Sequence, residues 1–264
     1  KKGYPCILYN QNPLWSEPAK TDLRHRLVDR MTPPLRMTPV MGEKKPGMTV
    51  KENDYFVPFV VEPGKPPEKR TYFEGGRVHI LCIGKYEIRK HHLELLRAVE
   101  QLGDKYEIHL TLVGEATNHF QKAYCGQVKK FVQEHRMENM VTVKTNVPRR
   151  DMEREYLAAD LYVIPSTLEM ASVSQLEAMS YSLPVICSDK NGTSCYVEDG
   201  VTGYLFRDCD EADLLRRLDE MLSDRERMLS MGAAGYGAVV EKYNFNKYFD
   251  TIMGMRERIC GGVK

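Results

Sequence analysis

The chain of 264 residues, with 42% apolar residues and a formal net charge of +1, is long enough for one large or two modest domains. Its near-neutral charge lacks the basic excess typical of nucleic-acid binding, and no apolar run reaches the length of a transmembrane helix. Seven cysteines without a C-x-x-C pair favour reduced thiols over disulfides or a metal site. We therefore expect a cytoplasmic protein that binds no nucleic acid and no metal ion.

The first 72 residues differ from the rest of the chain in the number and length of their apolar runs. Their apolar runs are short and too few to close a hydrophobic core of their own. Strands are predicted over residues 4–9, 35–40 and 55–61, and a basic amphipathic helix over residues 21–31. Prolines and Gly64 within residues 62–70 predict a linker. We interpret residues 1–72 as the tail of one domain plus this linker, and residues 73–264 as a second domain.

Basic side chains gather in this first part of the chain. They are Arg24, Arg26, Arg30, Arg36, Lys44 and Lys45. A solvated face is the favoured interpretation. The alternative is contact with an anionic acceptor or with the inner face of a membrane, where basic segments bind anionic lipids.

From residue 77 onward, apolar strands alternate with amphipathic helices. Strands are predicted over residues 78–83, 108–113, 141–143, 161–164, 185–186 and 202–206. Helices are predicted over residues 92–102, 124–135, 150–158, 173–181, 211–222, 224–242 and 245–258. Alternating elements joined by short loops predict an α/β fold with a doubly wound parallel sheet.

The loop after the first of these strands carries Gly84, Lys85 and Lys90. It has a single glycine, so it matches neither the G-x-G-x-x-G fingerprint nor the P-loop, which argues against a bound dinucleotide. Two lysines five positions apart can instead hold a diphosphate as point charges, with Arg89 as a weaker candidate. The alternative is an ordinary surface loop, and on either interpretation we expect both lysines to be exposed.

Two glutamates, Glu169 and Glu177, stand eight positions apart in the strand–loop–helix–strand unit of residues 160–189. On one helix they would lie about two turns apart and could not share a small ligand. With Glu169 on the loop and Glu177 in the first turns of the helix, both can face the crevice where open α/β sheets bind ligands. The helix start between them offers free N–H groups suited to phosphate.

Helix capping is the competing interpretation for these residues. Ser172 with Gln175, and Ser174 with Glu177, both fit the capping-box spacing. For Glu177 alone, capping and ligand binding are about equally compatible with the sequence. Glu169 precedes the helix, so no cap explains it, although by itself it also fits a solvated loop carboxylate.

The glutamate pair followed by LEAMSYSLPVICSD resembles the signature of retaining GT-B glycosyltransferases of family four. That family also commonly has G-[RK] with a lysine five residues further on, which Lys85 and Lys90 match. Two departures stand out. Residues 170–172 read Met-Ala-Ser in place of Gly-Phe-Gly, and Ser182 replaces a glycine, so we expect a helix end that does without the αL glycine.

The resemblance implies that residues 73–264 are the nucleotide-sugar-binding, Rossmann-like half of a GT-B fold. It implies retaining transfer of a hexose from a nucleoside diphosphate sugar to a hydroxyl acceptor, with no metal or other cofactor. Glu177 would bind the ribose, Glu169 the donor sugar, and Lys85 and Lys90 the departing diphosphate. Glu169, Lys85 and Lys90 are thus the implied catalytic residues.

The residues implied to bind the donor follow the carboxyl ends of the predicted strands. They are Gly84, Lys85, Lys90, Glu115, Asn146, Glu169, Ala171, Ser172, Val173 and Glu177. The implied partners are a carbohydrate or lipid-linked acceptor and an amino-terminal GT-B domain, without which we expect the chain to be an incomplete enzyme. A GT-B sugar-nucleotide epimerase and a non-catalytic nucleotide-binding module remain as alternatives.

Overall fold

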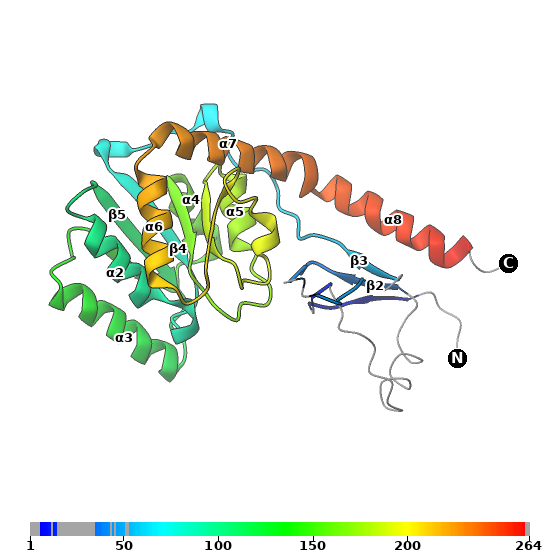
Figure 1. Cartoon of the computed structure of the whole chain (residues 1–264), viewed down its shortest axis with the longest axis horizontal. Helices are drawn as coiled ribbons and strands as arrows, with labels where there is room; N and C mark the ends of the chain where they lie inside the picture. The colour runs from blue at the N-terminus through cyan, green and yellow to red at the C-terminus, as the bar shows by residue number, and fades with distance from the viewer. Residues whose placement is uncertain are drawn as a thin grey trace.

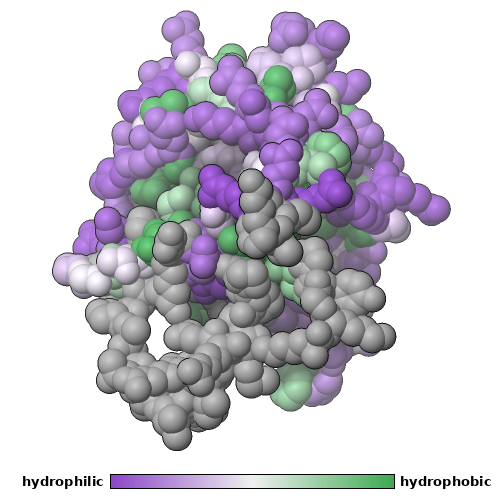
Figure 2. Space-filling model, turned by 90° about the vertical axis from the view of Figure 1, so that its right-hand side faces the viewer, coloured by the Kyte–Doolittle hydropathy of each residue, from purple (hydrophilic) through white to green (hydrophobic). Residues whose placement is uncertain are grey.

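The computed structural model describes residues 6–11, 13–14, 35–42, 44, 46–50 and 53–261. A six-stranded sheet with helices on both faces forms most of the molecule, and a three-stranded sheet lies beside it under α8 (Figure 1). Figure 2 views the molecule from the side of this small sheet and shows mostly hydrophilic residues, with scattered hydrophobic patches between them. No helix among the described residues is both long and apolar enough to cross a bilayer.

All strands of the large sheet run parallel, as predicted. Their spatial order is β6 (Val141–Thr145), β5 (Ile108–Gly114), β4 (Val78–Ile83), β7 (Leu161–Ile164), β8 (Val185–Ser188) and β9 (Gly203–Phe206). From β4 the chain winds outward to one side, and from β7 it winds outward to the other. The loops that follow β4 and β7 therefore face each other at a topological switch point, the usual ligand site of such sheets.

Two apolar clusters, one on each face, bury the sheet. The helices are α2 (His92–Leu102), α3 (His119–Glu134), α4 (Met152–Leu157), α5 (Ser174–Ser180), α6 (Glu211–Leu222), α7 (Arg225–Lys242) and α8 (Phe245–Gly261). Side chains from α2, α3 and α6 pack on one face, and side chains from α4 and α5 on the other. Strands β7 and β8 are buried along their whole length, which explains their unbroken apolar sequence.

The predicted helix over residues 124–135 is wrong at its start. Helix α3 begins at His119, because Asn118 caps it. The Asn118 side chain accepts a hydrogen bond from the Gln121 N–H at 2.9 Å, and the Gln121 side chain accepts one from the Asn118 N–H at 3.5 Å. This capping box stabilises a polar first turn that apolar periodicity cannot reveal. The helix predicted over residues 150–158 is a 3-10 turn, Arg149–Asp151, followed by α4.

Ser182 takes the αL conformation without being glycine. Its φ is 59°, so the helix end that we expected to do without an αL glycine still has the αL geometry. The buried Ser182 hydroxyl donates to the Lys65 carbonyl at 2.7 Å. That bond fixes the helix end against the segment that precedes the large sheet.

The small sheet consists of three parallel strands, β1 (Ile7–Tyr9), β2 (Leu35–Thr38) and β3 (Asp54–Phe56). It packs through Leu35 and Val57 against Met255 of α8. The strand expected over residues 55–61 is thus much shorter. The helix expected over residues 21–31 lies outside the described residues, as do Arg24, Arg26, Arg30 and Lys45. The domain boundary at residue 72 stays a prediction.

The proline-rich stretch of residues 62–70 is bonded to the large domain. Gly64 donates its N–H to the Ser180 carbonyl at 2.8 Å. The Arg70 guanidinium donates to the carbonyls of Tyr156, Leu157 and Ala159 at 3.1, 3.0 and 2.7 Å, and also to that of Tyr181. These carbonyls lie at the ends of α4 and α5, where most carbonyls lack an intrahelical N–H donor; among these described carbonyls, only that of Tyr156 also accepts a backbone bond, from the Ala159 N–H at 3.4 Å. One side chain therefore caps two helices and docks the linker.

We expect Arg70→Met to lower the free energy of unfolding by about 2–4 kcal/mol, because it leaves several partly buried carbonyls without a donor. Lys69→Met is the matched control, since Lys69 is exposed, and its effect should stay within about 0.5 kcal/mol. Urea unfolding followed by circular dichroism measures both. Equal stabilities of the two variants would show that Arg70 does not hold the helix ends.

Candidate functional site

The site is built around the carboxylate of Glu169, on the loop after β7. Its Oε2 accepts a hydrogen bond from Arg89 Nη1 at 2.9 Å and another from Lys90 Nζ. Both cations come from the loop after β4. The Thr167 N–H also donates to the Arg89 carbonyl at 2.9 Å. One backbone hydrogen bond and two contacts between charged side chains therefore join the two loops at the switch point.

The carboxylate of Glu169 is kept ionised although it is largely buried. Only 13% of its side chain is exposed. Burial would by itself raise the pKa of Glu169, but the hydrogen bonds and charges of Lys90 and Arg89 outweigh it, so the pKa is lowered. An ionised carboxylate between two cations can receive hydrogen bonds from hydroxyl groups of a ligand.

Lys85 and Lys90 differ, contrary to the expectation that both are exposed. Lys85 is 52% exposed, and its Nζ lies 3.4 Å from Glu115 Oε2. Lys90 is buried, and only 10% of its side chain is exposed. Its stem crosses Gly84, where an added Cβ would lie 3.2 Å from Lys90 Cδ. The single glycine of the loop thus leaves room for the lysine to reach Glu169.

Glu177 does not cap the helix. Its Oε2 accepts from the Tyr156 hydroxyl at 2.7 Å, and its Oε1 lies 3.3 Å from Arg149 Nη2. Helix α5 has Val173 at its N-cap position, with no side-chain cap. Both predicted capping boxes are therefore wrong. Ser174 instead accepts from the Tyr162 hydroxyl at 2.6 Å, and Gln175 donates to the Thr193 carbonyl at 2.8 Å.

The loop between the two glutamates is pinned from outside by residues 191–193. The Gly192 N–H donates to the Glu169 carbonyl at 2.7 Å. A Cβ at Gly192 would lie 2.2 Å from the Met170 carbonyl oxygen, so only glycine fits. The Ser172 N–H donates to Thr193 Oγ1 at 3.3 Å. Gly192 and Thr193 were not among the predicted site residues, because only the folded chain brings them to this loop.

The other predicted residues lie along the same sheet edge. Glu115 follows β5, and its pKa is lowered by a hydrogen bond from Thr117 and by the charge of Lys85. Asn146 follows β6 with φ 54°, and its Oδ1 accepts from the Ala116 N–H at 2.9 Å. Its side chain therefore holds two loops together. Ala171, Ser172 and Val173 are partly buried between the glutamates.

Two separate hollows flank the pinned loop. The Glu169 hollow, of about 400 Å³, is lined by Gln11, Pro13, Val40, Gly42, Leu168, Glu169, Met170 and residues 189–192. The Glu177 hollow, of about 460 Å³, is lined by Val60, Val61, Glu62, Arg149, Arg150, Met152, Glu153, Tyr156, Val173, Glu177, Ser180, Tyr181 and Phe245. They share no lining residue. The structure thus adds Tyr156 and Arg149 to the surroundings of Glu177, for which the sequence contains no motif.

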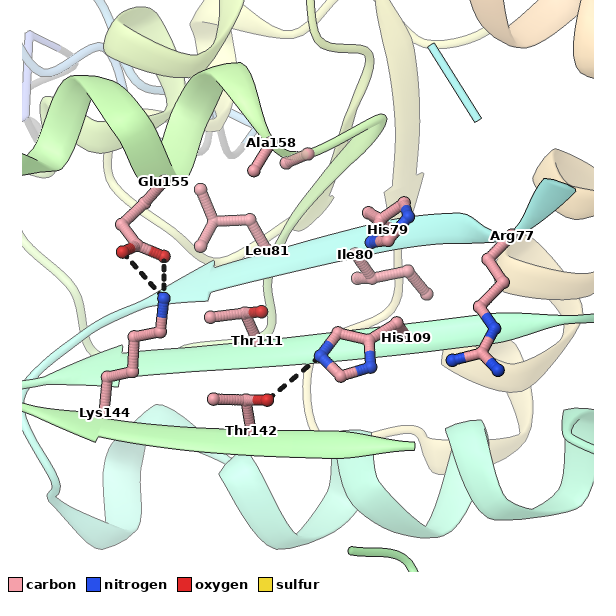
Figure 3. A pocket seen from close by; sticks show the side chains of 11 residues that line it. Arg77, His79, Ile80, Leu81, His109, Thr111, Thr142, Lys144, Glu155 and Ala158 are labelled. Atoms are coloured by element: carbon pink, nitrogen blue, oxygen red, sulfur yellow. Dashed lines mark hydrogen bonds and ion pairs between the residues drawn. The ribbon is translucent and has the colours of Figure 1, made fainter. Parts of the chain in front are cut away.

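A third hollow, of about 380 Å³, lies on the face of β4, β5 and β6 (Figure 3). Its polar groups are bonded to one another: Lys144 Nζ donates to both Glu155 oxygens at 2.8 Å, and His109 Nε2 lies 3.0 Å from Thr142 Oγ1. Burial, followed by the charge of His79, lowers the pKa of His109. None of the predicted site residues lines this hollow.

The six-stranded parallel sheet with helices on both faces matches the Rossmann-like domain of GT-B proteins. Residues 67–238 match the family Glycosyl transferases group 1, which is more than half of the chain. The chain therefore belongs to this family of retaining GT-B proteins, as the E-x7-E resemblance predicted.

Individual relatives agree with this assignment. Over 92 residues the chain is 37% identical to a D-inositol 3-phosphate glycosyltransferase of Nocardia farcinica, a match covering 35% of this chain and 20% of that relative. Sucrose-phosphate synthase from Thermosynechococcus elongatus has a TM-score of 0.73 at 18% identity, over 98% of this chain and 68% of that one. HepE from Anabaena, in complex with UDP, has a TM-score of 0.74 at 16% identity, over 96% and 72%. At such identities the two structures show the shared fold alone.

The lowered pKa of Glu169 makes its contribution to stability depend on pH. The ionised carboxylate stabilises the fold above its unfolded pKa of about 4.3, and this contribution is lost as the pH falls through the lower folded-state value. We expect Glu169→Gln to cost about 2–3 kcal/mol at pH 7, because buried Lys90 loses its counter-ion, and less at pH 3. Urea unfolding at both pH values measures this.

Glu115→Gln is the matched control, because it removes a carboxylate from the half-exposed pair with Lys85. Solvent screens such exposed pairs, so they contribute little to stability and little change is expected at either pH. An equal cost of Glu169→Gln at pH 3 and pH 7 would contradict the assignment of a charged pair.

Proposed function

We propose that this chain is the donor-binding part of a retaining glycosyltransferase that transfers a hexose from a nucleoside diphosphate sugar to a hydroxyl acceptor. The ionised Glu169 carboxylate between Lys90 and Arg89, at the switch point of a group 1 glycosyltransferase, is the observation that carries the proposal. The presence of UDP in the HepE complex supports a nucleoside diphosphate as the ligand class.

Each charged residue has a role that its contacts support. Glu177, on the first turns of α5, accepts hydrogen bonds from the ribose hydroxyls. Glu169 accepts them from hydroxyls of the donor sugar. Lys85, Lys90 and Arg89 hold the diphosphate and stabilise the negative charge that grows on it as the bond to the sugar breaks. These cations already lie beside carboxylates before any ligand binds, so little reorganisation is needed.

The acceptor side is proposed to lie toward the small sheet. Residues 1–72 would then be the tail of an acceptor-binding amino-terminal domain plus the linker. This boundary agrees with the separate small sheet and with the Arg70 contacts that dock the linker on the large domain. Under this proposal the acceptor is a carbohydrate or a lipid-linked carbohydrate.

Two simple assays separate this proposal from its alternatives. A sugar-nucleotide epimerase would convert a UDP-sugar to its epimer with no acceptor present, whereas the proposed chain would not. The non-catalytic alternative could bind a partner protein instead of a nucleotide, and in that form it would bind neither UDP nor GDP. Membership of a transferase family favours the transferase over the epimerase.

We expect Lys85→Ala to weaken UDP or GDP binding about tenfold, because one hydrogen bond to a charged group is lost. Uridine or guanosine, which lack phosphate, should bind as before. Lys105→Ala is the matched control, since Lys105 is 58% exposed and paired with Asp219 away from the sheet edge. Isothermal titration at low salt measures all three. Unchanged UDP affinity in the Lys85 variant would remove that lysine from the diphosphate site.

We also expect Glu177→Ala to weaken UDP binding more than Glu169→Ala does. UDP retains the ribose assigned to Glu177 but lacks the sugar assigned to Glu169. The Glu169 variant should instead lose the extra affinity of a UDP-sugar over UDP. Melting temperatures of both variants control for lost structural contacts, including the Tyr156 bond to Glu177. Equal losses of UDP affinity would contradict these two roles.

A further inference from the structure

The Glu169 hollow is lined both by a charged carboxylate and by exposed apolar side chains. Its charged carboxylate lies between two large apolar side chains on the same loop, Leu168 and Met170, which are 79% and 57% exposed. Pro13 and Val40 of the small-sheet region line it as well. Single exposed apolar residues are ordinary on a protein surface, but two of them beside a ligand-binding carboxylate point to a ligand with an apolar part.

The backbone holds these two side chains in place. Leu168 has φ 49°, a left-handed conformation that is unfavourable for leucine and persists only where the surroundings impose it. The next residues are pinned by the bond from the Gly192 N–H to the Glu169 carbonyl. Leu168 and Met170 are therefore presented on a fixed loop.

The volume and the charged lining residues of the Glu169 hollow limit the kinds of ligand that it can bind. Its volume of about 400 Å³ falls in the range of small-ligand pockets. Its charged lining residues are Glu169, Asp189 and Lys190, without an excess of cations. A second phosphate group therefore fits poorly, whereas an uncharged, amphiphilic molecule fits well.

We propose that the acceptor carries an apolar group next to its hydroxyl-bearing part, and that this group lies against Leu168 and Met170. The proposal rests on the transferase function and specifies its acceptor class, a glycoside with an alkyl or aryl aglycone. Its structural basis is the pair of exposed apolar side chains, Leu168 and Met170, on either side of Glu169. The apolar contact would bring the acceptor hydroxyl to the side of the loop where Glu169 meets the donor sugar.

The test compares the binding of methyl, n-octyl and phenyl β-D-glucoside to the 264-residue chain by isothermal titration, with octyl glucoside kept below its micellar concentration. We expect the octyl or phenyl compound to bind at least about tenfold more tightly than the methyl compound, because it buries apolar surface. Tighter binding of octyl glucoside indicates an alkyl aglycone, and tighter binding of phenyl glucoside indicates an aryl aglycone. Equal binding of all three would overturn the proposal.

Substitutions of Leu168 and Met170 test whether these side chains cause the preference for an apolar aglycone. In the double variant Leu168→Ser and Met170→Ser, both at exposed positions, the preference over the methyl compound should fall below about threefold. Phe120→Ser, at an 83% exposed position of α3, is the matched control and should keep the full preference. An undiminished preference in the double variant, or an equal loss in the control, would overturn the proposal. A parallel titration of the parent chain with UDP tests the donor site separately. If UDP does not bind, the proposed donor site is contradicted, but a measured preference for octyl or phenyl glucoside still supports the apolar contact.

Discussion

The fold at the switch point depends on the charged cluster of Glu169, Arg89 and Lys90. A buried charge without a partner is strongly destabilising, so the loops after β4 and β7 must stay in contact as long as Glu169 and Lys90 are buried. The cluster therefore acts as a structural clamp before it acts on any ligand. The two cations are held in position by this carboxylate, which also offsets their mutual repulsion.

Close approach of backbones makes this clamp possible. Gly84 leaves the space that the Lys90 stem crosses, and Gly192 lets residues 191–193 press against the loop that carries Glu169. The other side of the domain is fixed by Arg70, whose guanidinium bonds carbonyls at the ends of α4 and α5. Helix α5 is thus held at its start by the glutamate loop and at its end by the linker, which fixes Glu177 relative to Glu169.

The sequence predicts the parts of this structure that follow from local pattern. Buried parallel strands such as β7 and β8 are unbroken apolar runs, and α6 has clear helical periodicity, so their positions could be read directly. The start of α3 could not, because its first turn is polar and is stabilised by a cap. Nor could the burial of Lys90, since its partner Glu169 is 79 residues away and nothing local distinguishes Lys90 from exposed Lys85. The family resemblance predicted the candidate site residues, but only the fold shows which of them pair.

The positions of the two hollows define the path of a ligand that contacts both Glu169 and Glu177. The pinned loop of residues 169–173 separates them, with Glu177 on one side and Glu169 on the other. A ligand that contacts both glutamates must therefore pass along this loop and over the start of α5. Leu168 and Met170 lie at the Glu169 end of this path, where Pro13 and Val40 of the small-sheet region also line the hollow. Because the loop is fixed by Gly192 and Thr193, the residues at positions 170–172 can differ from the family pattern without displacing either glutamate.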